Sequence, residues 1–377
     1  MLTISFAKIS KRFKYIAFIL LFILSFFVGA VASYIFLHFQ KVFVANKPAV
    51  EVNDFIDSDL SKSFTVLVLG YGGAGHDGGN LSDVILVAHI NPETKKVTFI
   101  SVPRDLWVEL PMRSDLRESR KVNAAYAIGS DDKNYPLKEP QYKGEAGGGT
   151  MAKEVVSKVI GMPITYFIAV DFEGFKNIVD TLGGVEVNVP VTFDDYFYPI
   201  KGRENDTCGK SSSEIVKLHE LYSDTELHHQ FECRYEHIHY DQGSTKMNGD
   251  EALKFVRSRA SAQHGGDFAR SLRQQAVLTG IKEKFISGES LEKIDETFGQ
   301  LSKMIRTDLD LTTIKQLLEI YGSPEDYSFS YIGLNDQNVF VATKSLDSQF
   351  ILIPKEGENV WTEVHKYILE EINKSPS

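Results

Sequence analysis

The sequence is poor in cysteine and in positive charge, and each shortage excludes a class of function. Only two of its 377 residues are cysteines, Cys208 and Cys233, and they do not form a C-x-x-C pair. The paired C-x-x-C motifs of zinc modules are therefore absent. Lys and Arg number 41 against 51 Asp and Glu. Because duplex nucleic acid is bound by neutralising its phosphates, we expect no nucleic-acid partner for so acidic a chain.

Several common catalytic motifs are also missing. The chain contains no G-x-S-x-G and no H-E-x-x-H, and the Gly-rich segment from Gly70 to Asn80 is not followed by the Lys-Ser/Thr of a nucleotide P-loop. The whole chain is 43% hydrophobic and 11% aromatic, which indicates a folded protein with a sizeable core. Any phosphate chemistry must therefore come from a local basic pocket in an otherwise acidic protein.

One long hydrophobic run lies near the N-terminus. The 22 residues from Ile16 to Leu37 carry no charge, and at about 1.5 Å per residue they would cross a bilayer core as a helix. The preceding residues hold four positive charges and no acid, which leaves −14 for the rest of the chain. The positive-inside rule then predicts a cytoplasmic tail (1–15), a transmembrane signal anchor (16–38), a stalk (39–62) and an exported domain at the cell membrane.

Two alternatives to the anchor remain open, a cleaved signal peptide and a buried core helix. The anchor is favoured because the run is longer than a usual signal-peptide core and ends in a weak cleavage signal.

The body, residues 63–377, alternates strands and helices, which predicts a layered α/β domain. Pattern and turn residues predict the elements 64–69, 83–90, 96–102, 164–170, 185–189, 327–332 and 350–353 as strands, and a segment ending at 160, 172–182, one or two segments after 291, and 360–372 as helices. Strands 83–90 and 96–102 form a hairpin through Asn91–Thr94. Between the third strand and Thr150 we expect a polar, Gly-rich stretch.

A polar segment, 201–236, is predicted to be an insertion, and it carries both cysteines. In an oxidising compartment a Cys208–Cys233 disulfide would close this loop, and the alternative is two unpaired thiols. His237 and His239, with His228 and His229 nearby, offer a metal site. A solvated loop is the favoured reading, because polar loops seldom order metal ligands.

The strongest chemical signal is a cluster of cations between Asn248 and Gln274. Asn248 is a helix N-cap with Glu251 at the third helical position. Arg257 and Arg259 point the same way if the chain has left the helix by then, and Asp267 can cap a further helix. On that helix Arg270 and Gln274 share a face, with Arg273 one step round. This arrangement predicts an anion site, and the alternative is a solvated basic face.

A second cluster lies at the ends of two predicted strands. Asp83 follows the Gly-rich loop, and Arg104-Asp105 follows the third strand. Sites in α/β domains are built at strand ends, so Asp83 is a candidate ligand for a hard cation and Arg104 a candidate phosphate ligand. The alternative is that these groups only pair with their neighbours. His76 and Asp77 lie in the same loop and belong to this candidate site.

Seven ordered blocks of sequence resemble the LytR–CpsA–Psr family. They are Leu-Ser-Asp (81–83), Ser-Val-Pro-Arg-Asp (101–105), Lys-Val-Asn-Ala-Ala-Tyr (121–126), Val-Asp-Phe-Glu-Gly-Phe (170–175), Val-Asp-Thr-Leu-Gly-Gly-Val (179–185), Met-Asn-Gly-Asp-Glu-Ala-Leu-Lys-Phe-Val-Arg-Ser-Arg (247–259) and Gly-Asp-Phe-Ala-Arg-Ser-Leu-Arg-Gln (266–274). The resemblance implies a three-layer αβα domain with a mixed central sheet and a hydrophobic groove for a polyprenyl chain.

The resemblance also implies an activity and its residues. It implies Mg²⁺-assisted (or Mn²⁺-assisted) transfer of a phosphoglycan from a polyprenyl-pyrophosphate carrier to peptidoglycan. Asp83 matches the family's metal-binding aspartate. The substrate-binding candidates are Arg104, Lys121, Arg257, Arg259, Arg270, Arg273 and Gln274. Many members have a second metal-binding aspartate where this chain has Gly72, and Asp77 is a candidate to replace it.

The sequence hypothesis is thus a membrane-anchored glycan phosphotransferase. Arg104, Arg257 and Arg259 are the expected catalytic cations, and Asp105 and Asp267 are the candidates for the general base. Two rivals remain open: a pyrophosphatase that only cleaves the lipid diphosphate, and a non-catalytic membrane-anchored lipid-binding or regulatory module.

Overall fold

The computed structural model describes residues 63–76, 78–286, 305–309 and 326–374, together with Thr313 and Leu317. The predicted tail, anchor and stalk lie outside the described residues, as do most of the helices expected after Leu291. Among the helices that the structure does describe, none is long and apolar enough to span a bilayer.

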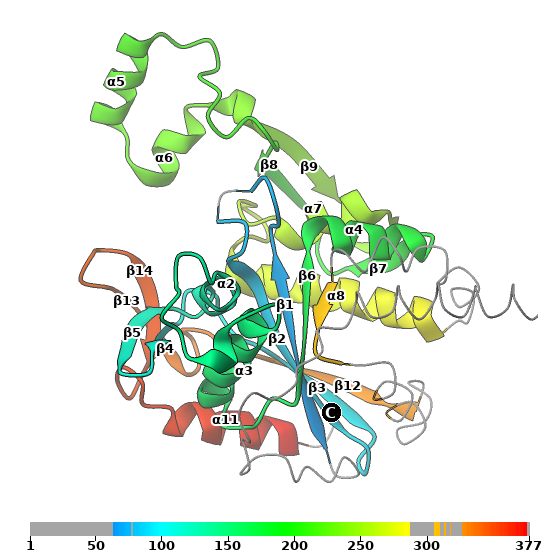
Figure 1. The fold of residues 1–377 in the computed structure, drawn as a ribbon. Helices are drawn as coiled ribbons and strands as arrows, with labels where there is room; N and C mark the ends of the chain where they lie inside the picture. Colours follow the sequence, from blue (N-terminus) through cyan, green and yellow to red (C-terminus); the bar gives the residue numbers. More distant parts are fainter. Residues whose placement is uncertain are drawn as a thin grey trace, which may run out of the picture.

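The centre of the fold is a mixed six-stranded sheet (Figure 1). Its strands lie in the order β11 (Ile305–Thr307), β6 (Tyr166–Asp171), β1 (Phe64–Tyr71), β2 (Ser82–Asn91), β3 (Lys96–Ser101), β12 (Ser328–Gly333). The β1–β6 and β3–β12 pairs are parallel and the other three antiparallel. The predicted mixed sheet and hairpin are therefore confirmed. The carboxyl ends of β1, β3, β6 and β12 meet the amino end of β2 at one border, here called the carboxyl edge.

One face of the sheet carries the main core. Alternate side chains of the strands, Leu67, Leu69, Ile85, Ile100 and Phe167 among them, are almost fully buried there. They pack against α2 (Ala124–Ser130), α3 (Gly147–Ile160) and α11 (Thr362–Asn373), which cover this face together (Figure 1).

The prediction of a polar, Gly-rich stretch before Thr150 is wrong, because much of this segment has regular secondary structure. It contains the hairpin β4 (Trp107–Arg113)–β5 (Leu116–Lys121), helix α2, the 3₁₀ turn η1 (Pro140–Tyr142) and the first turn of α3. Its glycines serve close packing and not flexibility. A Cβ on Gly149 would lie 2.2 Å from the ring of Phe167 on β6. The sequence pattern of turn residues cannot distinguish this use of glycine from a loop.

Replacing Gly149 by alanine is therefore expected to lower the free energy of unfolding by about 3 kcal/mol, the upper end of the usual penalty for overpacking. The matched control is Gly333→Ala, since a Cβ there meets no atom within 4 Å. Denaturant unfolding of both variants measures the difference. Equal stability of the two variants would contradict this account of α3 and β6.

The opposite face of the sheet is covered in part by α8 (Gly266–Ile286). Thr279 of α8 lies 3.4 Å from the hydroxyl of Tyr331 on β12, and Lys282 lies 3.9 Å from the ring centre of Phe329. A second core joins α8 to four further elements. They are α4 (Phe172–Thr181), β7 (Val185–Val189), β10 (Gly243–Met247) and α7 (Gly249–Arg257).

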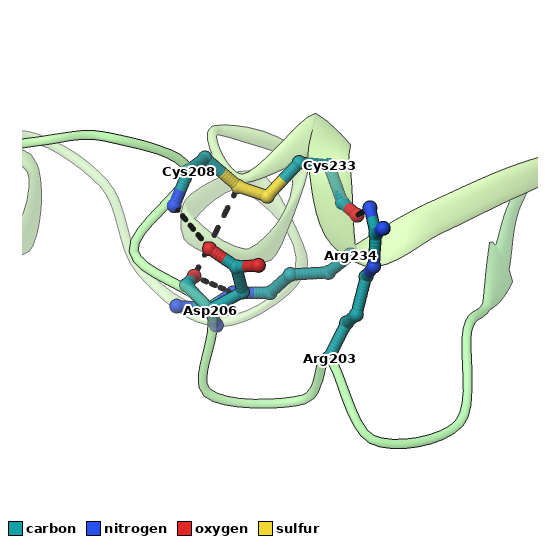
Figure 2. Close-up of a disulfide and its surroundings, with 5 residues drawn as sticks. All are labelled: Arg203, Asp206, Cys208, Cys233 and Arg234. Atoms are coloured by element: carbon teal, nitrogen blue, oxygen red, sulfur yellow. Dashed lines mark hydrogen bonds between the residues drawn. A yellow bond between two sulfur atoms is a disulfide. The ribbon is translucent and has the colours of Figure 1, made fainter.

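An arm projects from the body on a two-stranded ribbon (Figure 1). The ribbon is β8 (Phe193–Pro199) with β9 (Tyr235–Tyr240), and between them lie α5 (Ser212–Leu221), α6 (Asp224–His229) and the turn η2 (Glu232–Arg234). The predicted insertion is thus not a simple loop. A disulfide joins Cys208 to Cys233, so the alternative of two free thiols is wrong (Figure 2).

The same close-up shows the contacts around the disulfide, beyond the end of the ribbon that lies farther from the body. The guanidinium of Arg234 donates to the backbone carbonyl of Asp206 at 2.7 Å, and Arg203 donates to that of Cys233 at 3.3 Å (Figure 2). A final hairpin, β13 (Phe340–Lys344) with β14 (Phe350–Pro354), precedes α11.

Candidate functional site

Four of the predicted site residues form one chain of ion pairs at the carboxyl edge. Arg104 donates to the carboxylate of Asp83, which lies near the start of β2. The Nε of Arg104 lies 3.5 Å from Asp105 Oδ2, and Lys121 Nζ at the end of β5 lies 2.6 Å from Asp105 Oδ1. The two strand ends that the sequence predicted to cooperate therefore do meet, and they bring two cations and two carboxylates together.

The two carboxylates of this chain are placed differently. Asp105 is only 13% exposed, and each of its oxygens faces a cation. It therefore orients Arg104 and Lys121, and its predicted role as a general base does not fit these contacts. Asp83 is 37% exposed, and the neighbouring hydroxyl of Ser82 is buried without a hydrogen-bond partner among the described residues. Such an all-oxygen group fits a hard cation that takes its remaining ligands from phosphates and water.

Arg257 is held by aromatic side chains at the end of α7. The helix begins with the predicted cap, a reciprocal capping box between Asn248 and Glu251, and the chain leaves the helix at Ser258 (φ −51°, ψ 136°). The guanidinium of Arg257 lies 4.3 Å from the ring centre of Phe172 and donates to the hydroxyl of Tyr198 at 3.2 Å. Stacking and one hydrogen bond fix the plane of the group, and within the described part of the chain no other hydrogen bond to its guanidinium is seen.

The Gly-rich loop connects Arg257 with the ion-pair chain. His76 of this loop packs edge-on against Phe172, the same ring that carries Arg257, with the ring centres 5.2 Å apart. The loop then runs directly into Ser82 and Asp83. Partial burial, with Lys201 and Arg257 nearby, lowers the pKa of His76. Lys201 and Arg257 therefore lie near this loop, together with Glu173 and Glu204, which act on the pKa of His76 in the opposite direction.

The start of α4 fixes the other side of this loop. Asp171 caps α4 by accepting from the amide of Gly174 at 2.7 Å. A Cβ on Gly73, whose φ is +80°, would lie 3.0 Å from the Asp171 side chain. Only glycine combines this backbone conformation with so close an approach.

The turn that follows Arg257 is clamped from within the protein. Asp195 on β8 is 1% exposed, and its Oδ2 accepts from the Ser258 hydroxyl at 2.7 Å and from the amides of Arg259 and Ala260 at 3.2 Å each. A buried carboxylate with three donors is well satisfied and fixes the backbone that it binds. Asp195 therefore positions the segment that carries Arg257 and Arg259.

Arg273 is not placed as the sequence predicted. It is fully buried, and its three nitrogens donate to the carbonyls of Phe255 (2.9 Å), His264 (2.7 Å) and Ser258. Burial lowers its pKa to about 10, so it remains charged at neutral pH. The donors of Arg273 are occupied by backbone carbonyls of the turn after α7. Arg273 therefore stabilises this turn and is not a surface ligand for an anion.

Replacing Arg273 by methionine is expected to lower the free energy of unfolding by about 3 kcal/mol, because three buried carbonyls lose a charged donor. Arg113→Met is the control, since that side chain is 42% exposed and pairs with the exposed Asp115 at the tip of β4. Chemical denaturation followed by circular dichroism compares the two. An Arg273→Met protein as stable as the control would contradict the structural role.

The remaining predicted residues lie on or near α8. Arg259 has an exposed side chain and a backbone amide fixed by Asp195. Arg270 and Gln274 lie one turn apart on α8, beside the buried stripe that contains Arg273. Asp267 lies in the first turn of α8, which begins at Gly266 and not after Asp267, and its side chain is outside the described part. Asp77 also lies outside the described residues.

Sequence reasoning missed the residues that support the cations. Tyr198 and Asp195 lie on a strand without clear periodicity in the sequence. Phe172 was recognised as part of a family-like block and as the start of a helix, without a role in holding a cation. At the carboxyl end of β1, the rings of Tyr71 and Tyr126 lie 5.2 Å apart, and burial raises the pKa of both hydroxyls. Phe172 and Tyr126 belong to two of the blocks that resemble the family, whereas no short motif marks Tyr71, Asp195 or Tyr198.

The structure is thus an α/β domain with a cluster of cations and carboxylates at one edge of a mixed sheet. A model of the LytR_cpsA_psr family matches residues 33–361, and the chain belongs to this family.

Individual relatives are more distant. The chain is 28% identical over 273 residues to the polyisoprenyl-teichoic acid–peptidoglycan teichoic acid transferase TagV of Bacillus subtilis, with 71% of this chain and 55% of the relative aligned. It is 29% identical to the transferase TagU of Bacillus cereus, with 68% and 65% aligned. The chain thus spans less than two thirds of the length of these relatives.

Solved structures support the fold. The crystal structure of Bacillus subtilis TagV matches with a TM-score of 0.52 at 24% identity and covers 84% of this chain and 99% of that one. The protein gbs0355 from Streptococcus agalactiae matches with a TM-score of 0.56 at 22% identity, over 84% and 90%. At such identities these likenesses concern the fold alone.

Proposed function

We propose that this protein is a membrane-anchored phosphotransferase that moves a glycopolymer from a polyprenyl-pyrophosphate carrier to peptidoglycan. The observation that carries the proposal is the grouping of Asp83, Arg104 and Lys121 at the carboxyl edge, linked through the Gly-rich loop to Arg257. Its family membership and the transferase names of its relatives support the same reading. The uncharged run 16–38 is the proposed anchor, with the catalytic domain outside the cell.

The sheet face beneath α8 offers a place for the lipid. On the main-core face the strand side chains are almost fully buried, whereas Val68, Val84 and Ile168, which alternate with them, are only half-buried. Val84 directly follows Asp83, so this apolar strip begins where the ion-pair chain ends. A polyprenyl tail on the strip would place its diphosphate beside Arg104, because apolar surface and charge adjoin there.

The reaction follows from these positions. An acceptor hydroxyl attacks the phosphorus that bears the glycan. A new P–O bond forms, the bond to polyprenyl phosphate breaks, and the proton of the hydroxyl passes to water. Negative charge grows on the leaving phosphate, and Arg104 and Arg257 are the groups proposed to donate to it. Lys121 and Asp105 keep Arg104 in place. When bound at Asp83, Mg²⁺ or Mn²⁺ would supply further charge neutralisation of the diphosphate oxygens.

One product analysis separates this proposal from its rivals. The purified full-length chain is incubated with a polyprenyl-pyrophosphate-linked glycan, with and without peptidoglycan, and the products are identified by mass spectrometry. We expect a glycan joined to peptidoglycan through a phosphodiester, and polyprenyl monophosphate as the second product. Free glycan phosphate in equal yield without acceptor would favour a pyrophosphatase. Tight donor binding without any product would favour a binding module.

A further inference from the structure

Two histidines at the base of the arm lie in a setting that the sequence did not predict. His237 and His239 are two residues apart on β9 and therefore point to the same side of the ribbon. Asp194 on β8 is the cross-strand partner of His239 and points to that side as well. The ring of Tyr196 stacks on His237, with the ring centres 4.2 Å apart. The histidines are thus ordered by a strand and a ring, and not carried by a solvated loop.

Both imidazoles are aimed at one oxygen atom. His237 Nε2 and His239 Nδ1 each lie 2.8 Å from Asp194 Oδ1. The second nitrogen of His239, Nε2, lies 3.3 Å from a carboxylate oxygen of Asp241. A neutral imidazole has only one N–H. If His239 donates that hydrogen to Asp241, its Nδ1 lone pair faces the Asp194 carboxylate. Either a second proton on the ring or a metal ion bound beside both atoms then removes the repulsion.

We propose that Asp194, His237 and His239 form a binding site for a divalent transition-metal ion such as Zn²⁺. Imidazole nitrogens with one carboxylate are a donor set of such ions, whereas Mg²⁺ prefers oxygen ligands alone. When Nδ1 of His239 binds the metal, Asp241 accepts the hydrogen on Nε2 of the same ring and so fixes its tautomer. The three side chains are partly exposed, and the ring centres of the two histidines lie 6.5 Å apart. Binding would therefore require the rings to turn until their nitrogens face one ion beside Asp194.

The neighbouring arm has another set of ligand-type side chains, which carries no site. Within the described part of the chain, Asp206, Cys208 and Cys233 are the group whose ligand atoms all lie within 4.8 Å of one another. Both sulfurs are joined in the disulfide and supply no thiolate. The metal at the ribbon would tie β8 to β9 and so fix the direction in which the arm leaves the body.

The test is a Zn²⁺ titration of the full-length chain in detergent, after metal removal and without thiol reductants, against a chromophoric chelator. We expect one Zn²⁺ per chain, bound in the presence of millimolar Mg²⁺, and a rise in melting temperature on binding. His237→Ala and His239→Ala should each lose this binding, and Asp241→Asn should weaken it by about 10- to 100-fold. His219→Ala, which removes an exposed histidine of α5, is the matched control and should bind as the wild type does.

Two further variants keep the result unambiguous. Asp194→Asn has nearly the same size, so it tests the site if a histidine variant melts early without metal. Asp83→Asn should retain the bound Zn²⁺, which separates this site from the proposed phosphotransfer site. No binding by the wild-type chain, or unchanged affinity in both histidine variants, would overturn the proposal.

Discussion

The Arg257→Ala protein is expected to transfer glycan about 100- to 1000-fold more slowly than the wild type, because one preplaced donor to the developing phosphate charge is lost. The guanidinium is fixed by Phe172 and Tyr198 before substrate arrives, so little reorganisation is needed in the transition state. Arg257→Lys should recover only part of the rate, since an ammonium group cannot both stack on Phe172 and donate through a planar fork. Steady-state transfer to peptidoglycan from a lipid-linked donor measures these rates.

A stability control separates catalysis from folding. Arg257 is only half-buried and terminates its helix, so Arg257→Ala should unfold within about 1 kcal/mol of the wild type. Arg113→Ala, at the remote tip of the β4–β5 hairpin, should have the full transfer rate. Wild-type turnover by the Arg257→Ala protein would rule out the role given to this residue.

The second large effect is expected for Asp83→Asn. This change keeps the size of the side chain but removes the charge that pairs with Arg104 and offers an oxygen ligand to a hard cation. Transfer should fall by about 100-fold or more, by analogy with the loss of a single electrostatic contact in other active sites. The remaining activity should no longer respond to Mg²⁺, and an Mg²⁺ titration of both proteins shows whether it does.

Asp115→Asn is the matched control for this experiment, because Asp115 is 73% exposed and pairs with Arg113 away from the carboxyl edge. It should keep both the wild-type rate and the wild-type response to Mg²⁺. An Asp83→Asn protein with an unchanged Mg²⁺ response would show that the cation is bound elsewhere.

Much of the sheet could be predicted because its strands have simple patterns. The apolar run at Val66–Leu69 ends at a glycine, and Asn91 accepts from the amides of Glu93 and Thr94 in the predicted hairpin turn. The caps at Asp171 and Asn248 were also readable, since a side-chain oxygen three residues before a free amide is a local feature. Local chemistry therefore predicted the ends of these elements well.

The parts that were missed depend on contacts between distant segments. Gly149 is a packing residue only because Phe167 lies against it, and the sequence pattern resembles a loop. Arg273 is an apparent member of the cation cluster, and its burial follows from the carbonyls of a turn that starts fifteen residues earlier. The ribbon of His237 and Asp194 joins residues 43 apart. Periodicity within one element contains no information on such pairs.

The central claim is that guanidinium groups at the carboxyl edge hold a lipid diphosphate beside the apolar strip. Its most direct test is native mass spectrometry of the full-length chain with a polyprenyl diphosphate, comparing the wild type with the Arg104→Ala/Arg257→Ala double variant. We predict that the wild type retains one lipid per chain and the double variant loses it, while both bind equally little of the corresponding polyprenol. Equal retention of the diphosphate by the two proteins would contradict the account.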